Sequence, residues 1–351
     1  MEGRNAFAPG SRIFCEVRNN EKAAMTQGQT QLASVDVAIP NYNYGRYLRS
    51  CVESVQRQEI DRLRILIIDN ASTDDSSKIA REIAATDSRV ELRLRTRNIG
   101  AHASFNEAID WAESEFFTIV CSDDSLPDGS LKRAISAFER HPDANLVFGE
   151  TLFVQDEQIA DIPAEMGPAG EHYVTGDTFL RSFCATGRSP VTGPMTVVRT
   201  KAQKQLGHYN PQLPHTDDME MWMRFGTIGA IIRLDDVQSI VRIHGANQSA
   251  VLTNVHLWNL QAEAAFETFF ATHGRSLQEA RKLLGTAKRS LSDRAYWCAI
   301  SHLVRGDPAV GSLMGFAITR HPISAVVPPF GYLWRRPDAL SRLTRLLGRK
   351  K

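Results

Sequence analysis

Short apolar runs alternate with amphipathic stretches along the chain up to residue 149. The runs have the length of buried strands and end at a proline, an aspartate or a polar turn. They cover residues 35–39, 64–68, 116–121 and 146–149. Between the first two runs, Leu48, Cys51, Val52 and Val55 recur at the i, i+3, i+4 and i+7 spacing of one helical face. This alternation predicts strands that are each followed by a helix.

Further elements complete this pattern. Helices are predicted near 72–85, 105–112, 131–138 and 219–226, and a half-exposed strand at 90–95. Residues 155–172 contain several prolines and glycines and predict a loop, while the rest of 194–249 predicts short strands. Strands alternating with helices indicate an α/β fold with a mostly parallel sheet flanked by helices. In such sheets, ligands bind beyond the carboxyl ends of the strands.

The chain divides into three predicted regions. Residues 1–33 are polar and mixed in charge, without the apolar segment of a secretion signal, and we expect a disordered leader. Residues 34–250 form the predicted α/β domain, and 251–351 a helical C-terminal region. Its tail, 335–351, carries seven Arg or Lys residues and one Asp. This basic tail predicts either peripheral contact with an anionic membrane or a solvated helix.

The composition of the chain argues against several classes of protein. A formal charge of +1 argues against a globally basic nucleic-acid binder. The five cysteines are scattered and form no CxxC pair, which fits a reducing compartment better than a disulfide framework. No run of about 18 apolar residues occurs, so no spanning helix is expected. We expect a cytoplasmic protein, with the inner face of the membrane as its possible place of contact.

Asp123 and Asp124 follow the apolar run 116–121 directly. Adjacent carboxylates raise each other's pKa unless a cation compensates their charge. Oxygen ligands completed by a substrate phosphate are the usual site of Mg²⁺ or Mn²⁺. The pair therefore predicts a metal–diphosphate site, although the surrounding turn-forming residues also suit an ordinary turn or helix cap.

Other polar residues lie at predicted strand ends. Asp69 and Asn70 suit the edge of a base or ribose, and they equally suit a cap of the next helix. Asp217 and Asp218 open the predicted helix near 219–226, where they act either as a favourable pair at the helix N-terminus or as a general base. Arg242 and His244 share one face of a predicted strand. They suit a leaving diphosphate, His244 as a metal ligand and Arg242 as a charge clamp, although a single histidine also has structural uses.

Taken together, these motifs resemble those of family 2 glycosyltransferases. The resemblance is carried by 37–43, by 67–74, by Asn98-x-Gly100, by Ser122-Asp123-Asp124, by Asp217-Asp218 with Trp222 and Arg224, and by Arg242-x-His244 with Ser249. The motifs come in the family's order and span about residues 34–250. The resemblance implies a GT-A fold of Rossmann-like type, a nucleoside-diphosphate sugar donor that is usually UDP-linked, a divalent cation (Mn²⁺ or Mg²⁺) and inversion at the anomeric carbon.

The resemblance also implies roles for individual residues. Asp124 and His244 would hold the metal, and Asp123 would contact the metal or the ribose. Asp218 would be the base that activates the acceptor hydroxyl, with Asp217 as the alternative. The nucleotide would be bound by the remaining motif residues, namely Pro40, Asn41, Tyr42, Asp69, Asn70 and Arg242.

The chain departs from the family's pattern at one position that matters for the metal. Cys121 stands where many relatives carry a further aspartate, so no third carboxylate is expected from that strand. The acceptor would be a saccharide or a lipid-linked saccharide in the synthesis of a surface polysaccharide or glycolipid. Two other functions remain open: a nucleotidyltransferase acting on sugar phosphates, and a nucleotide-binding module without turnover.

Overall fold

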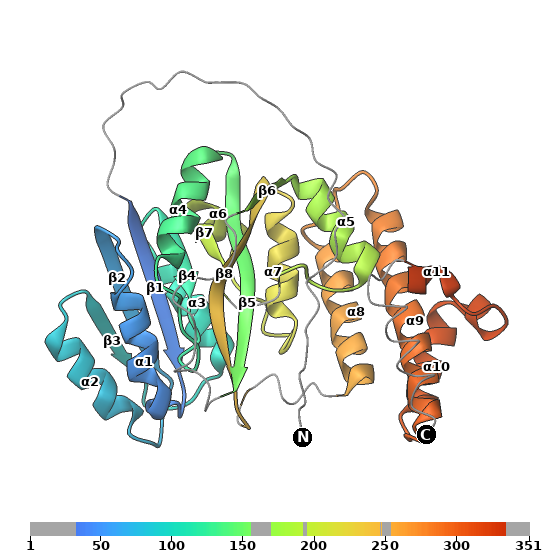
Figure 1. The fold of residues 1–351 in the computed structure, drawn as a ribbon, viewed down its shortest axis with the longest axis horizontal. Helices are drawn as coiled ribbons and strands as arrows, with labels where there is room; N and C mark the ends of the chain where they lie inside the picture. Colours follow the sequence, from blue (N-terminus) through green and yellow to red (C-terminus); the bar gives the residue numbers. More distant parts are fainter. Residues whose placement is uncertain (1–32, 156–169, 192–194, 246, 248–253, 335–351) are drawn as a thin grey trace. The chain divides into compact units, whose positions relative to one another are not determined.

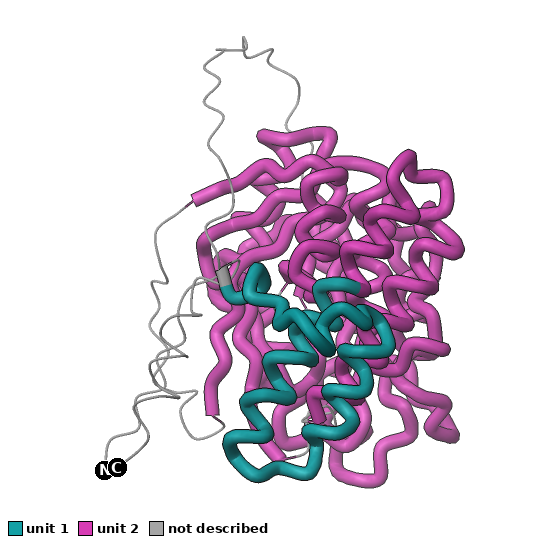
Figure 2. Tube along the Cα trace, turned by 90° about the vertical axis from the view of Figure 1, so that its right-hand side faces the viewer, with its two compact units in different colours: residues 1–31, 289–351 teal, residues 32–288 magenta. Residues whose placement is uncertain are grey.

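The computed structural model describes residues 33–155, 170–191, 195–245, 247 and 254–334. The chain divides into two compact units (Figure 2), one of residues 32–288 and one of residues 1–31 with 289–351. The sequence placed a boundary at 250, whereas the larger compact unit continues to Lys288. The predicted leader lies outside the described residues except for Ala33.

The larger unit is an α/β domain with eight strands in one sheet, among the described residues (Figure 1). Its strands are β1 (Ser34–Asn41), β2 (Arg62–Asp69), β3 (Val90–Leu94), β4 (Phe116–Ile119), β5 (Ala144–Gln155), β6 (Glu171–Val174), β7 (Val197–Arg199) and β8 (Ala230–Ile243). Its helices are α1 (Gly45–Gln56), α2 (Ser76–Thr86), α3 (Ala101–Trp111), α4 (Ser130–Arg140), α5 (Gly176–Thr186), α6 (Thr200–Leu206), α7 (Asp217–Phe225) and α8 (Val255–Ala271).

The strand order is β3-β2-β1-β4-β7-β5-β8-β6. The pairs β1–β2, β1–β4, β2–β3 and β5–β8 are parallel, while β7 and β6 run antiparallel to their neighbours. The predicted α/β class with a mostly parallel sheet is therefore confirmed. Parallel pairing brings the carboxyl ends of β1, β2 and β4 to one edge of the sheet.

The sheet separates two apolar layers. Val35, Val37 and Ile39 of β1 pack into one core with Leu48 of α1 and Leu131 of α4. Successive strand residues point to opposite faces, so Ala38 and Asp36 lie on the other side, where α3 contacts β1. Asp36 is fully buried, and its carboxylate accepts hydrogen bonds from the Glu113 and Ser114 amides at 2.6 and 2.9 Å. This carboxylate fixes the turn before β4.

The loop after β1 is held by a close backbone approach. The Gly45 amide, at the start of α1, donates to Oδ2 of Asp74 at 2.9 Å. A Cβ added at Gly45 would lie 2.9 Å from the Ser76 amide nitrogen, closer than real contacts allow. Glycine at position 45 therefore lets the first turns of α1 and α2 lie side by side, just after the ends of β1 and β2.

Two predictions on local structure were wrong. Residues 230–243 form one long strand instead of short pieces, because β8 pairs with the whole length of β5 through irregularities of register near Gly149. A Cβ at Gly149 would lie 2.4 Å from Cγ of Gln238, so the close approach of β5 to β8 at this point requires glycine. The end of the predicted loop 155–172 forms part of strand β6, which pairs with β8, and 156–169 lie outside the described residues.

The smaller unit is helical where it is described. It contains most of α9 (Ala280–Val304), then α10 (Val310–Arg320), the 3₁₀ helix Pro322–Ala325 and α11 (Phe330–Trp334). Within it, the indole Nε1 of Trp297 donates to the Pro329 carbonyl at 3.0 Å. The predicted helical C-terminal region is confirmed. Among the described helices, none is both long and apolar enough to cross a bilayer.

Candidate functional site

The strand ends bring the predicted polar residues of β1 and β2 together. Asn41 and Asp69 are partners in the β1–β2 register, and Nδ2 of Asn41 donates to Oδ1 of Asp69 at 2.8 Å. Asp69 also accepts from the amide and the hydroxyl of Ser72, at 3.0 and 2.6 Å. The Asp69 carboxylate is thus held rigidly beside the turn into α2. Pro40 is partly buried on β1, and Tyr42 is 42% exposed.

Asn70 is buried and directed at a neighbouring loop. Its Oδ1 accepts from Nη1 of Arg95 at 3.0 Å and from the Ile99 amide at 3.1 Å, while its Nδ2 donates to Oδ1 of Asn98 at 2.7 Å. These contacts fix the segment between β3 and α3. Asn70 therefore shapes this end of the site through the backbone that it holds.

Asp123 and Asp124 lie in a tight turn after β4, in which the Asp124 amide donates to the Cys121 carbonyl at 2.9 Å. Both side chains are buried, with exposures of 8% and 4%. Desolvation and the neighbouring Asp123 charge raise the pKa of Asp124 to about 8, and desolvation also raises the pKa of Asp123. The protein by itself therefore disfavours the doubly ionised pair.

The end of β8 covers this acid pair. The Arg242 amide donates to Oδ1 of Asp124 at 3.1 Å, and Nε of Arg242 donates to the Asp123 carbonyl at 3.1 Å. Nε2 of His244 lies 3.2 Å from Oδ2 of Asp123. Asn247 adds an amide 3.4 Å from the same oxygen. The structure thus brings together Asp123, Asp124, Arg242 and His244, as the sequence predicted.

Two tyrosines at the start of α1, Tyr44 just before the helix and Tyr47 in its first turn, complete the enclosure of this acid pair. The Tyr47 ring stacks on His244 with centroids 4.9 Å apart, and the Arg242 guanidinium lies 4.6 Å from the Tyr47 centroid. Tyr44 meets His244 edge-on at 5.4 Å, and burial with the nearby Asp123 charge raises the pKa of Tyr44 to about 12. Tyr44, Tyr47 and Asn247 were missed by the sequence analysis. Only the aromatic content of 42–47 signals the two tyrosines, because their partner His244 lies about 200 residues away along the chain.

The donor set at this turn fits a hard or intermediate divalent cation. Ligand atoms of Cys121, Asp123 and Asp124 all lie within 4.8 Å of one another. Buried carboxylate oxygens that repel one another are the groups that a cation stabilises. Asp124, Asp123 and His244 are the residues that would hold it.

The second acid pair opens α7. Nε2 of His102, on α3, lies 3.2 Å from Oδ2 of Asp217, and this contact raises the pKa of His102. Asp218 is exposed to solvent, yet neighbouring protein desolvates its carboxylate, and together with the Asp217 charge this raises its pKa to about 7. A carboxylate with a pKa near neutrality is suited to accept a proton.

The two acid pairs act on common neighbours. Desolvation raises the pKa of the Cys121 thiol, and the charges of Asp124, Asp123 and Asp217 raise it further. Desolvation, followed by the charges of Asp217 and Asp218, likewise raises the pKa of the buried Tyr209. Cys121 therefore lies within electrostatic reach of Asp123, Asp124 and Asp217, which indicates that the two pairs lie near each other.

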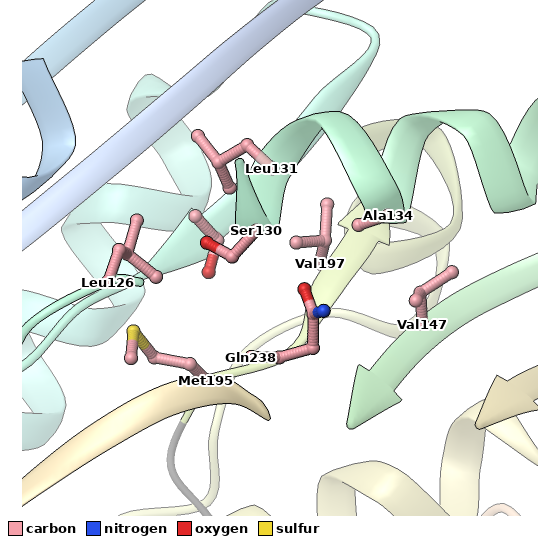
Figure 3. A pocket seen from close by; sticks show the side chains of 9 residues that line it. Leu126, Ser130, Leu131, Ala134, Val147, Met195, Val197 and Gln238 are labelled. Atoms are coloured by element: carbon pink, nitrogen blue, oxygen red, sulfur yellow. The ribbon is translucent and has the colours of Figure 1, made fainter. Parts of the chain in front are cut away.

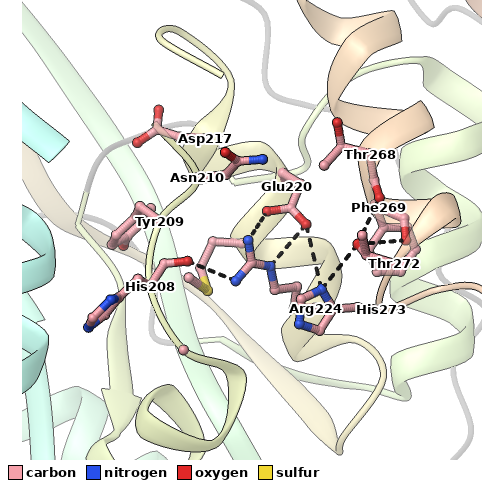
Figure 4. Close-up of polar contacts among 12 residues, drawn as sticks. His208, Tyr209, Asn210, Asp217, Glu220, Arg224, Thr268, Phe269, Thr272 and His273 are labelled. Atoms are coloured by element: carbon pink, nitrogen blue, oxygen red, sulfur yellow. Dashed lines mark hydrogen bonds and ion pairs between the residues drawn. The ribbon is translucent and has the colours of Figure 1, made fainter. Parts of the chain in front are cut away.

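A buried ion pair fixes α7 (Figure 4). Nε of Arg224 donates to Oε1 of Glu220 at 2.9 Å, and a second contact joins Nη2 to Oε2. Nη1 of Arg224 donates to the carbonyls of Leu206 and His208 at 3.0 and 2.8 Å. Glu220 and Arg224 are 0% and 6% exposed. This network ties the helix that carries both acids to the preceding loop.

A small cavity between α4 and the sheet lies apart from the two acid pairs. It measures about 10 Å³ and is lined by side chains such as Leu131, Val197 and Gln238 (Figure 3). This volume accommodates at most about one water molecule. The acid pairs do not line it, so it is a packing gap under the sheet.

Residues 36–207 match the family model described as glycosyl transferase family 2. Glycosyltransferase GlyG of Streptococcus pneumoniae is 32% identical over 145 residues, which cover 41% of this chain and 45% of that protein. The succinoglycan biosynthesis protein ExoA of Rhizobium meliloti is 26% identical over 62% of this chain and 65% of its own. The chain thus spans less than two thirds of the length of either relative.

One solved structure shows the same fold. The mannosyltransferase PcManGT from Pyrobaculum calidifontis, in complex with GDP-Man and Mn²⁺, aligns with a TM-score of 0.53 at 17% identity, covering 92% of this chain and 89% of that one. The fold is therefore the GT-A type, a Rossmann-like sheet flanked by helices. The segment 36–207 therefore belongs to glycosyltransferase family 2.

Proposed function

We propose that this protein is an inverting glycosyltransferase, which moves a sugar from a nucleoside-diphosphate sugar to an acceptor hydroxyl. The observation that carries the proposal is the presence of two acid pairs in one site. Asp123 and Asp124 suit the cation and the diphosphate, and Asp217 and Asp218 suit the acceptor. A direct displacement needs a group that stabilises the leaving diphosphate on one side of the anomeric carbon and a base for the acceptor on the other side. Such a displacement inverts the configuration at that carbon.

The donor is proposed to be UDP-linked, which is the usual donor of the family. Asp69 lies at the end of β2 with a fixed carboxylate that can accept an N–H from a uracil ring, while Pro40, Asn41 and Tyr42 line the neighbouring strand end. Asn70 contributes by holding the 95–99 segment. Guanine also offers an N–H donor, so a GDP-linked sugar is the competing donor to be tested.

Asp218 is proposed to remove the proton from the acceptor hydroxyl as the oxygen attacks the anomeric carbon. Asp217 is already in contact with His102, which leaves Asp218 as the more open carboxylate. Arg242 is held between Tyr47 and the Asp123 carbonyl, where its charge favours a diphosphate. A bound Mn²⁺ or Mg²⁺ would supply charge stabilisation for the departing diphosphate.

A nucleotide screen tests this proposal. Thermal shifts would be measured for UDP, GDP, their sugar conjugates and the free sugar phosphates, each with Mn²⁺, with Mg²⁺ and with EDTA. We expect a cation-dependent shift with UDP and a UDP-sugar, followed by release of UDP when an acceptor is added. Release of pyrophosphate from a nucleoside triphosphate would instead identify a nucleotidyltransferase. Binding without release of any product under all acceptors tried would identify a binding module.

The acceptor is proposed to be a saccharide or lipid-linked saccharide in polysaccharide or glycolipid synthesis at the inner face of the cytoplasmic membrane. The name of the relative ExoA, a succinoglycan biosynthesis protein, supports the polysaccharide. The basic tail 335–351, outside the described residues, supports membrane contact. Just before it, Ile323, Val326, Val327 and Phe330 are 63%, 84%, 58% and 56% exposed. Exposed apolar side chains beside a basic segment suit an anionic lipid surface.

Vesicle sedimentation tests the membrane contact. The full chain should sediment with vesicles containing anionic lipid and remain in solution with neutral vesicles or at high salt. Deleting 335–351 should abolish this binding, and Val326→Asp with Val327→Asp should weaken it. Unchanged sedimentation of both variants would exclude this surface.

A further inference from the structure

Cys121 occupies the centre of the site, where the sequence alone assigned it no role. It precedes the acid pair by two residues, and the turn that follows folds Asp124 back so that its amide donates to the Cys121 carbonyl. The Cys121 side chain is partly exposed. Its Sγ lies within 4.8 Å of a carboxylate oxygen of Asp123 and of one of Asp124. A thiol this close to both carboxylates is in a position to share a ligand with them.

Packing alone does not account for this arrangement. Cys51 already occupies the adjacent buried position, with no exposed surface, and its Sγ approaches the Cys121 carbonyl at 3.5 Å. An apolar side chain at 121 would serve the core equally well. An aspartate at position 121 would add a third carboxylate, with hard oxygen ligands, to this turn. A cysteine at the same position adds a soft sulfur ligand instead.

We propose that Cys121 is a ligand of the divalent cation, and that its sulfur makes this site prefer thiophilic cations such as Cd²⁺, Zn²⁺ and Co²⁺ over Mg²⁺. The S–metal bond forms as the thiol proton leaves to solvent, so no redox partner is needed. Asp124 and Asp123 supply the oxygens of the same site. The inference rests on the proposed cation site of the transferase, but its test requires no transfer of sugar.

Cadmium titration of the full-length protein tests this ligand. Cd²⁺ bound to a thiolate absorbs in the ultraviolet through sulfur-to-metal charge transfer, whereas oxygen ligation gives no such band. We expect a band that saturates at one equivalent in the native protein and in Cys298→Ser, a matched control in the helical unit. In Cys121→Ser the band should vanish and the dissociation constant for Cd²⁺ should rise on the order of tenfold or more. Affinity for Mg²⁺ should change by less than about threefold.

A second variant and a second measurement guard against loss of fold. Cys121→Asp restores a charged oxygen ligand and should reverse the preference, with Mg²⁺ binding strengthened and the charge-transfer band absent. In the native protein, alkylation of Cys121 by iodoacetamide, followed by peptide mass spectrometry, should slow by on the order of tenfold with Cd²⁺ and remain nearly unchanged with Mg²⁺.

Three outcomes would overturn the inference. They are a native protein without the band, a Cys121→Ser variant that keeps it, and alkylation at an equal rate with and without Cd²⁺. A protein that shows the band but transfers no sugar would leave the ligand standing and refute the proposed function. The two failures are therefore distinguishable.

Discussion

Nε2 of His102 lies 3.2 Å from Oδ2 of Asp217, and this contact joins α3 to the first turn of α7. Contact with the Asp217 carboxylate raises the pKa of His102, which favours the protonated imidazole. Asp218, one residue further on, is exposed and has a pKa raised to about 7. Two adjacent aspartates therefore have different environments. This difference supports the proposal that Asp218 accepts the proton of the acceptor hydroxyl.

Asp218→Asn should lower the rate of sugar transfer by about 10²- to 10⁴-fold, the range for loss of a general base. Binding of nucleotide with Mn²⁺ should stay within about threefold, because the cation turn is intact. Asp217→Asn is the matched control and should lose less activity. Isothermal titration and single-turnover assays separate the two effects. Full activity in Asp218→Asn would exclude it as the base.

The transfer rate should rise with pH through about 7. Asp218 accepts a proton only in its ionised form, and its pKa of about 7 sets the midpoint. The measurement is kcat against pH between about pH 5 and pH 9 with saturating donor. Substituting His102→Ala removes the imidazole whose protonated form Asp217 favours, so the repulsion on Asp218 grows and the midpoint should move upward. A rate independent of pH in this range would contradict the assignment.

The metal-free protein should lose stability as pH rises towards 8. A carboxylate whose folded pKa lies above its unfolded value of about 4 stabilises the fold in its protonated form, and that contribution disappears as pH passes through the folded value. For Asp124 the folded pKa is about 8. We expect the Tm in EDTA to fall by a few degrees between about pH 5 and pH 8.5.

Two comparisons isolate Asp124 in that experiment. Asp124→Asn should flatten the pH dependence and raise the Tm at high pH, because the buried repulsion is gone. In the native protein, added Mn²⁺ should restore the Tm at high pH by binding only the folded state. The variant should gain little from Mn²⁺. Equal stabilisation of both proteins by Mn²⁺ would remove Asp124 from the set of ligands.

Arg224→Met should destabilise the domain by about 3–5 kcal/mol, because it leaves the fully buried Glu220 charge without its partner. The matched control is Arg181→Met, whose ion pairs with Asp177 and Glu279 are exposed and should contribute little to stability. Urea unfolding of both variants measures the difference. A loss no larger than that of the control would show that α7 is held by its apolar face alone.

Tyr47→Leu should weaken cation-dependent nucleotide binding by roughly tenfold, because it removes the ring that supports Arg242 and His244. Leucine keeps this buried position apolar, so the Tm should change little. Tyr173→Leu, at a 47% exposed position on β6, is the control. Unchanged affinity in Tyr47→Leu would mean that the end of β8 needs no aromatic support.

The sequence predicted the fold where local pattern and topology agree. The apolar run 35–39 lies inside β1, and 64–68 lies inside β2, because both strands are buried on both faces. The acids after β4 and β2 were predicted as one site, because parallel strands must end at the same edge. That reasoning needs only the order of elements along the chain.

Contacts between distant segments could not be predicted in the same way. The pairing of β5 with β8 depends on irregularities of register near Gly149, and no local pattern in 230–243 marks a strand of that length. His102 lies on a helix whose apolar spacing gives no sign of Asp217. The closeness of the Cys121 sulfur to both aspartates depends on the turn that folds Asp124 back towards it, and residue type alone does not reveal that turn.

The long strand β8 has a consequence for how the protein can be divided. It delivers Arg242 and His244 to an acid pair about 120 residues earlier in the chain, and α7 lies just before it. The segment that matches the family model ends at residue 207, before either element. A fragment cut there would keep the turn with Asp124 and lose both the end of β8 that covers it and the proposed base, Asp218. A minimal expressed form should therefore retain residues through at least 247.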